Sequence, residues 1–178
     1  KSRCRKAMSD YVDFSTAMGL PQQKQRLRVG EKIKSSGNGK VIPITKGYID
    51  RVALKEVPGL GEKEIYTLQE AHKKVLETAM KENGSKEIAF LLGDDMELLR
   101  TVFGNETEID LSVSERHKAR YVIHNHPDNA SFSNRDVFWF ANNSATQYFS
   151  IVKNNGNVEL LCKAKEFDRK AVYFHVFG

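Results

Sequence analysis

The chain has 178 residues, of which 40% are hydrophobic and 29% are charged. This length predicts one domain with at most an appendage, and the apolar share excludes a wholly disordered chain. Two cysteines are too few for a disulfide scaffold, so we expect reduced thiols and a cytoplasmic location. A phage-encoded protein or an effector is compatible with this expectation. The sequence has no signal peptide and no apolar run near the roughly 18 residues that span a bilayer, which excludes a membrane partner.

The basic residues are concentrated at the N-terminus. Residues 1–60 carry 13 Lys and Arg against 5 Asp and Glu, a net charge of +8, whereas residues 61–178 carry 15 against 18, a net charge of −3. The segment Pro21–Val41 is polar and basic and contains no aromatic residue. We therefore predict a basic N-terminal extension, 1–60, which serves as a solvated tether, and a domain, 61–178, that folds without it.

The extension also allows a weak contact with nucleic acid, mainly with phosphates, although it lacks the aromatic side chains that stack on bases. The chain does not begin with Met, and we expect it to be part of a larger polypeptide. A titration with nucleic acid at low and physiological salt distinguishes the tether interpretation of this segment from the nucleic-acid-binding interpretation.

Helical and strand patterns alternate after residue 61. Apolar residues recur at helical spacing over 62–82, and Asn83-Gly84 ends this helix. The elements predicted after it are a strand at Glu87–Leu92, its hairpin partner Met96–Phe103, a short helix at Ser114–Arg120, a strand at Tyr121–His126, a helix at Ser133–Asn143, and a hairpin of Tyr148–Val152 and Val158–Cys162. This order predicts an α/β domain with a mixed β-sheet flanked by helices.

Candidate metal ligands occur where the strand 121–126 ends. His124 and His126 are two residues apart, so both imidazoles lie on one face of the strand. Asp136 follows in the first turn of the next predicted helix. Two imidazoles and one carboxylate, with a fourth position left for water, form a zinc site of the catalytic type. A His-x-His pair on a strand, taken by itself, has a purely structural role at least as often as it binds a metal.

A catalytic zinc site also needs a proton acceptor and a group that supports the oxyanion. Glu87, at the start of a neighbouring strand, is the candidate base, with Glu97 and Glu106 as alternatives or a plain strand-edge charge as the simpler explanation. Ser133 can direct its hydroxyl at the oxyanion. The spacing Ser133-x-x-Asp136 is also that of a helix capping box, which would alone explain both residues.

The order Glu, His-x-His-Pro and Ser-x-x-Asp resembles the pattern of the JAMM (JAB/MPN+) metalloprotease superfamily, over about residues 61–178. The resemblance implies a JAMM-like (cytidine-deaminase-like) mixed sheet flanked by helices. It implies that His124, His126 and Asp136 bind one Zn²⁺ per chain. It also implies that Glu87 activates the zinc-bound water, and that Ser133 supports the oxyanion formed when this water attacks an amide or isopeptide carbonyl.

Within the superfamily, the residues around the histidines are similar to the RadC-like branch and to JAB-like domains of phage head-morphogenesis and polymorphic toxin proteins. Five residues separate Pro127 from Ser133, where better-known members have six, so substrate contacts from this loop do not transfer directly. The resemblance implies a zinc metalloprotease or isopeptidase that acts on a protein or peptide. The alternative is a RadC-like nucleic-acid-associated module or a phage structural module without proteolytic activity.

Overall fold

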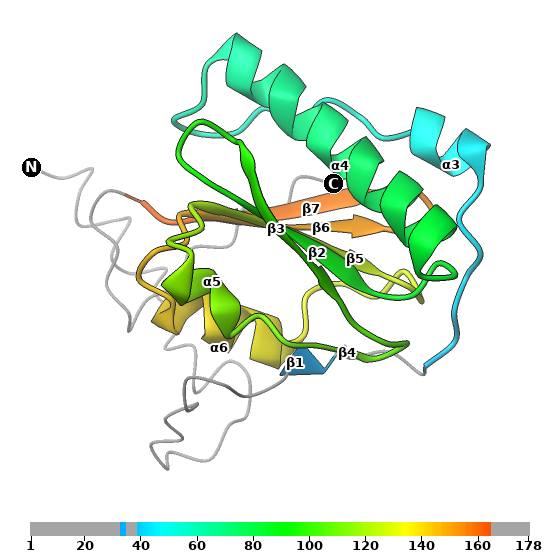
Figure 1. Cartoon of the computed structure of the whole chain (residues 1–178). Helices are drawn as coiled ribbons and strands as arrows, with labels where there is room; N and C mark the ends of the chain where they lie inside the picture. Colours follow the sequence, from blue (N-terminus) through cyan, green and yellow to red (C-terminus); the bar gives the residue numbers. More distant parts are fainter. Residues whose placement is uncertain (1–32, 35–38, 165–178) are drawn as a thin grey trace, which may run out of the picture.

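The computed structural model describes residues 33–34 and 39–164 (Figure 1). Most of the predicted basic extension, including Cys4, lies outside these residues. The described elements, in chain order, are β1 (Ile33–Lys34), α3 (Lys46–Asp50), α4 (Glu62–Glu82), β2 (Ile88–Leu92), β3 (Leu98–Phe103), β4 (Glu108–Ile109), α5 (Val113–Arg116), β5 (Tyr121–His126), α6 (Asn134–Asn142), β6 (Tyr148–Lys153) and β7 (Val158–Cys162).

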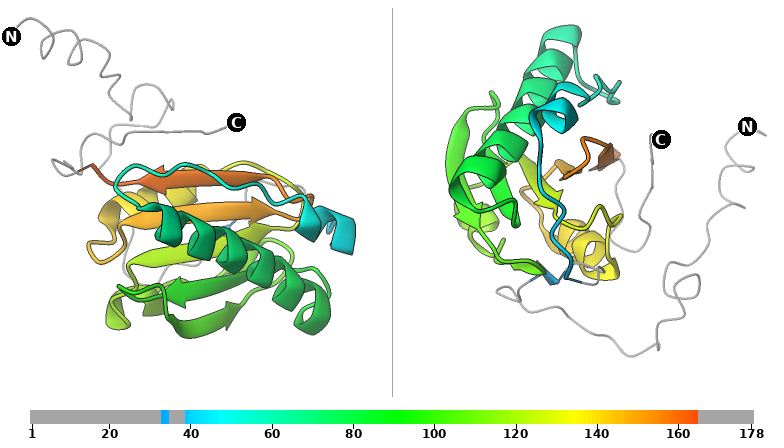
Figure 2. Two further views of the ribbon diagram at one scale, coloured as in Figure 1. Left: turned by 90° about the horizontal axis from the view of Figure 1, so that it is seen from above. Right: turned by 90° about the vertical axis from the view of Figure 1, so that its right-hand side faces the viewer.

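Five strands form one mixed sheet in the order β3-β2-β5-β6-β7. The pair β5–β6 is parallel and the other three pairs are antiparallel. Helix α4 lies on one side of this sheet and α6 on the other (Figures 1 and 2). The predicted α/β domain with a mixed sheet and flanking helices is thus confirmed. The additional pair of β1 and β4 was not predicted, because strands of two residues are too short to show a pattern.

The boundaries predicted after residue 61 agree with the structure to within two residues, except at the end of one helix. The helix predicted over Ser114–Arg120 ends at Arg116. The cause is local, because Lys118 adopts a left-handed backbone with φ of 51°. The amide of Ala119 then donates to the carbonyl of Ser114 at 3.0 Å and closes the helix end, as in a Schellman motif.

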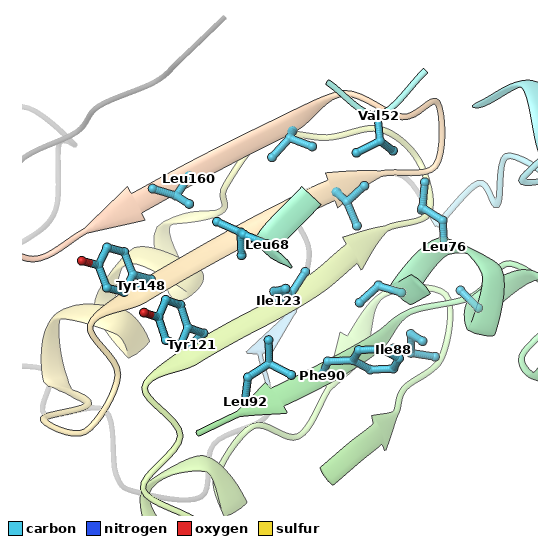
Figure 3. Packing of buried hydrophobic residues seen from close by; sticks show 14 of the residues in the cluster. Val52, Leu68, Leu76, Ile88, Phe90, Leu92, Tyr121, Ile123, Tyr148 and Leu160 are labelled. Atoms are coloured by element: carbon cyan, nitrogen blue, oxygen red, sulfur yellow. The ribbon is translucent and has the colours of Figure 1, made fainter. Parts of the chain in front are cut away.

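One apolar cluster lies between α4 and the sheet (Figure 3). Leu68 and Leu76 from the predicted apolar stripe of α4 are buried against Phe90 and Ile123 of β2 and β5. The helix ends where Gly84 and then Ser85 adopt positive φ angles of 58° and 64°. The chain thereby reverses and enters the sheet at β2.

The same cluster includes side chains that precede residue 61. Ile44, Ile49, Val52 and Val57 are each at most 6% exposed and belong to this core. These residues fall within the predicted N-terminal extension. A chain that begins at residue 61 therefore lacks part of its core.

A second apolar cluster lies between the sheet and α6. Leu91, Val122 and Phe149 extend from the strands toward Val137 and Phe140 of the helix. Because side chains alternate along a strand, this face of β5 also carries the two histidines. In the described part of the chain, no helix is both long and apolar enough to cross a membrane.

Candidate metal centre

The register of β2 and β5 brings Glu87 beside the histidines. Ala89 of β2 pairs with His124 of β5 in an antiparallel ladder. Glu87 precedes Ala89 by two residues, so its side chain lies on the same face of the sheet. His126 follows His124 by two residues and shares this face as well. The antiparallel direction therefore brings Glu87 and both imidazoles together at one end of the sheet.

The two imidazoles are in direct contact. The Nε2 atoms of His124 and His126 are 2.9 Å apart, and Oε1 of Glu87 lies 3.9 Å from His124 Nε2. All three side chains are buried. Each of them offers one ligand atom within 4.8 Å of the other two, so this group can hold a metal ion.

Asp136 reaches the same point from the start of α6. Its Oδ1 lies 3.6 Å from His124 Nε2, and its Oδ2 lies 3.7 Å from His126 Nε2. The predicted capping box holds it there: the amide of Ser133 donates to Oδ2 at 2.6 Å, and the amide of Asp136 donates to Ser133 Oγ at 3.1 Å. The capping and the ligand interpretations of these residues are therefore compatible.

Several polar atoms of this group are buried without a hydrogen-bond partner among the described residues. They are both carboxylate oxygens of Glu87, Nδ1 of His124 and Oδ1 of Asp136. Buried polar atoms in native proteins are nearly always hydrogen-bonded, so such a concentration needs an explanation. A divalent cation bound between imidazole and carboxylate donors supplies one, and nitrogen and oxygen ligands of this kind suit zinc as well as other transition metals.

Hydrogen bonding and burial keep His126 in a form that can bind a metal. Its Nδ1 lies 3.0 Å from the carbonyl oxygen of Ala130. A carbonyl only accepts, so Nδ1 carries the proton and the Nε2 lone pair faces His124 and Asp136. Burial and the neighbouring His124 lower the pKa of His126 from 6.5 to about 4, which keeps the ring neutral at pH 7.

The two carboxylates differ in their electrostatic environment. Burial raises the pKa of Glu87 well above its ordinary value, and the negative charges of Asp136, Asp128 and Glu108 raise it further. Burial alone would also raise the pKa of Asp136. The imidazoles of His124 and His126 and the bond from Ser133 outweigh burial, so the pKa of Asp136 lies below its ordinary value. Asp136 is thus suited to remain an anion and Glu87 to exchange a proton.

Aromatic side chains close the site on the side of α6. The ring of Phe149 stacks on His124 with centroids 4.9 Å apart and an interplanar angle of 11°. Phe132 belongs to the loop between β5 and α6, and its ring centroid lies 6.5 Å from that of His124. This loop is tied to β6 and β7 because Ser131 Oγ donates to Glu159 and accepts from Lys153. The apolar wall limits the access of water to the imidazoles.

The five residues predicted from the sequence gather around this end of the sheet. The alternative carboxylates have other partners: Glu97 accepts from the amide of Asp95 in the β2–β3 turn, and Glu106 pairs with Lys86 at 2.8 Å. Both are more exposed than Glu87, which is fully buried. The structure therefore favours the position of Glu87 over these two.

Sequence reasoning missed two buried amides behind the site, Asn125 and Asn154. Nδ2 of Asn125 donates to Oδ1 of Asn154 at 2.8 Å. The available signal was an Asn within the strand 121–126, since Asn is disfavoured in strands unless its side chain has a specific partner. The sequence also gave no sign that Phe132 and Phe149 lie beside the site, because their position against His124 depends on the tertiary packing.

The comparisons with known proteins did not supply a relative. No protein-family model, no curated protein and no solved structure matches the chain.

Proposed function

We propose that this protein is a zinc-dependent hydrolase of amide or isopeptide bonds, with a protein or peptide as its substrate. The observation that supports the proposal is the buried convergence of two imidazoles with the carboxylates of Glu87 and Asp136, in which four polar atoms have no hydrogen-bond partner among the described residues. The pattern of these residues along the chain resembles that of JAMM metalloproteases, which favours this class over other metal-dependent hydrolases.

His124, His126 and Asp136 would hold the zinc. A zinc ion bound in this way acts as a Lewis acid and brings the pKa of a water ligand close to 7. His126 is preset for this role by its bond to Ala130, and Asp136 by the capping box at the start of α6.

Glu87 would act as the general base and then as the acid toward the leaving amine. Its carboxylate lies 3.9 Å from His124 Nε2 and makes no hydrogen bond among the described residues. Because burial raises its pKa, a proton taken up by Glu87 is held more tightly than on an exposed carboxylate. It is thus able to accept a proton and to pass it on at neutral pH.

Ser133 would stabilise the oxyanion. Its Oγ already accepts the amide of Asp136, which leaves the hydroxyl proton available for donation. The N-cap position holds the hydroxyl at the rigid start of α6, next to a proposed zinc ligand. A pre-positioned donor of this kind contributes about 3 kcal/mol to stabilising such a transition state.

The zinc content of protein purified without chelators tests this proposal. We expect one zinc per chain in the parent, and its loss in His124→Ala, because the variant lacks one of the two nitrogen ligands. His117→Ala is the matched control, since His117 lies at the end of α5 and belongs to no metal-ligand group of the described residues. Circular dichroism verifies that both variants fold. A folded His124→Ala protein that retains as much zinc as the parent contradicts the ligand assignment.

A further inference from the structure

The backbone of Glu87 is hydrogen-bonded to the residues that follow β3, the edge strand next to β2. Its amide donates to the carbonyl of Asn105 at 3.0 Å, and its carbonyl accepts from the amide of Gly104 at 2.8 Å. Both bonds connect Glu87 to the end of β3. The side facing β5, where the histidines lie, is held in a different way.

The ladder between β2 and β5 stops before it reaches Glu87. Its last pair is Ala89 with His124. Beyond it, the side-chain amide of Asn125 replaces the backbone of β5 as hydrogen-bond partner. Oδ1 of Asn125 accepts from the amide of Ile88 at 2.7 Å, and Nδ2 donates to the carbonyl of Lys86 at 3.2 Å. These are the main-chain groups on either side of Glu87.

The Asn125 amide is itself held in one orientation. Its Nδ2 also donates to Oδ1 of Asn154, whose own Nδ2 donates to the carbonyls of Ile42 and Ser85 at 2.7 and 2.8 Å. Both amides are buried, and the donors and acceptors in this relay are matched. On the opposite face of the sheet, Glu87 and His124 retain polar atoms that have no hydrogen-bond partner among the described residues.

We infer that Asn125 is a positioning residue that sets the distance between Glu87 and the two imidazoles, an assignment that rests on the proposed function. Asn125 stands between His124 and His126 in the chain, and its side chain binds the residues before and after Glu87. One residue thus joins the backbone that carries the histidines to the backbone that carries the carboxylate. Without its amide, the backbone of Glu87 is held from the end of β3 and by Asn83 at the end of α4, and the ladder leaves its β5 side unbound.

Binding of Co²⁺ to the metal-free protein tests the inference without a substrate. The visible absorption of Co²⁺ reports the ligand geometry, and a titration gives its dissociation constant. The Glu87 carboxylate lies within 4.8 Å of both imidazole ligand atoms, where its oxygens would hydrogen-bond a water ligand of the bound Co²⁺, so its displacement changes the spectrum and weakens binding without removing a proposed ligand. We expect Asn125→Leu to weaken Co²⁺ binding by about tenfold or more and to alter the spectrum, as is usual when a residue that supports a metal site is removed. Asn125→Ser, a smaller and polar replacement, provides a second variant with the same expectation.

Asn143→Leu is the matched control for a general loss of stability. Asn143 is also buried, and its side chain makes three hydrogen bonds, to Ser114, Ala145 and Thr146, at the far end of α6. We expect this variant to lower the thermal midpoint and to keep the parent's Co²⁺ spectrum and affinity. Equal changes in the Asn125 and Asn143 variants would overturn the positioning role.

A double-mutant cycle identifies the residue through which Asn125 acts. In a Glu87→Ala background, we expect Asn125→Leu to change the Co²⁺ dissociation constant by no more than about twofold, because the carboxylate that it positions is absent. The inference is overturned if folded Asn125 variants bind Co²⁺ as the parent does, or if their effect is equally large without Glu87. A parent protein that binds neither zinc nor Co²⁺ instead overturns the proposed function.

Discussion

At the scale of single residues, Glu87 stands out because it is a fully buried carboxylate with neither oxygen hydrogen-bonded among the described residues. Burial of an unpaired carboxylate costs free energy, and in the folded protein this cost appears as a raised pKa. The group would be an unfavourable choice for stability alone. Under the proposed function, its position beside His124 would give it a use in proton transfer, which offsets this cost with a catalytic benefit.

We predict that Glu87→Gln raises the free energy of unfolding of the metal-free protein at pH 7, by on the order of 1 kcal/mol. Folding raises the pKa of Glu87 well above its ordinary value of 4.5. The raised pKa therefore stabilises the folded parent fully below pH 4.5, and this contribution is lost as the pH rises toward the pKa of the folded state. Gln carries no charge and lacks this loss. Urea denaturation at pH 4 and pH 7 measures the difference.

The same variant is expected to retain zinc and to lose at least about 10²-fold in hydrolysis, because an amide cannot accept the proton. Glu97→Gln is the control, since Glu97 is exposed in the β2–β3 turn. Full activity of Glu87→Gln on a substrate that the parent cleaves would show that another group is the base.

At the scale of elements, the N-terminus of α6 combines a helix cap with a proposed metal ligand. Ser133 and Asp136 satisfy each other's backbone amides, which stabilises the helix start. The same bonds hold the Asp136 carboxylate within 4 Å of both imidazoles. A helix N-terminus also favours a nearby anion, which agrees with the low pKa of Asp136.

We predict that Ser133→Ala lowers the free energy of unfolding by about 1 kcal/mol, the usual cost of losing an N-cap hydroxyl. Zinc should remain bound, because the backbone amide of residue 133 still donates to Asp136. Ser133→Thr keeps the capping oxygen and should unfold like the parent. Thermal unfolding and metal analysis of the three proteins provide the test, and an unchanged midpoint in Ser133→Ala would show that the capping box adds no stability.

Helix α4 makes a buried polar contact with β6, away from the candidate metal centre. His72 Nε2 lies 2.7 Å from Ser150 Oγ inside the core, and burial lowers the pKa of His72 from 6.5 to about 3. The neutral ring is thus part of the packing between this helix and the sheet. Protonation of His72 would place an unpaired charge in that core.

This contact predicts acid sensitivity. Below pH 6.5 the unfolded chain protonates His72 while the folded chain does not until about pH 3. The folded state therefore loses about 1 kcal/mol per pH unit in this range. The double variant His72→Leu/Ser150→Ala removes this contribution without leaving a buried hydroxyl unpaired. We expect urea denaturation to show a smaller loss from pH 7 to pH 4 in the variant than in the parent, and identical pH dependence would contradict the assignment.

At the scale of the whole molecule, residues 41–60 contact both the α4 face of the sheet and the polar residues behind the candidate metal centre. They contribute four buried apolar side chains to the core. The amide of Ile42 donates to the carbonyl of Pro127, directly after His126, and its carbonyl accepts from Asn154. This segment therefore supports both the core and the polar residues behind the candidate site.

We predict that a chain of residues 39–178 has the thermal midpoint and zinc content of the full chain, whereas a chain of residues 61–178 is strongly destabilised. Burial of a large aliphatic side chain contributes about 1.5–3 kcal/mol, and the shorter chain loses Ile44, Ile49, Val52 and Val57. Calorimetry and metal analysis compare the two. Stable folding of residues 61–178 would show that these contacts are dispensable.

The sequence by itself determined the longer helices and strands after residue 61 and the identity of the candidate residues. The helix Glu62–Glu82 and the strand Tyr121–His126 were predicted with the observed ends. Alternation along a strand also places His124 and His126 on one face without further information. These features depend on local periodicity and on capping and turn residues, which are encoded within a few positions of the chain.

Only the tertiary structure decided which distant residues meet. The pairing of Ala89 with His124 selects Glu87 over Glu97 and Glu106, and no local pattern contains that register. The hydrogen bonds from the Asn125 side chain to the residues before and after Glu87 depend on where the ladder ends. The burial of Ile44, Ile49, Val52 and Val57 depends on their packing into the core that α4 forms with the sheet. Contacts between residues far apart in the chain arise from packing and strand register, and these are properties of the assembled sheet.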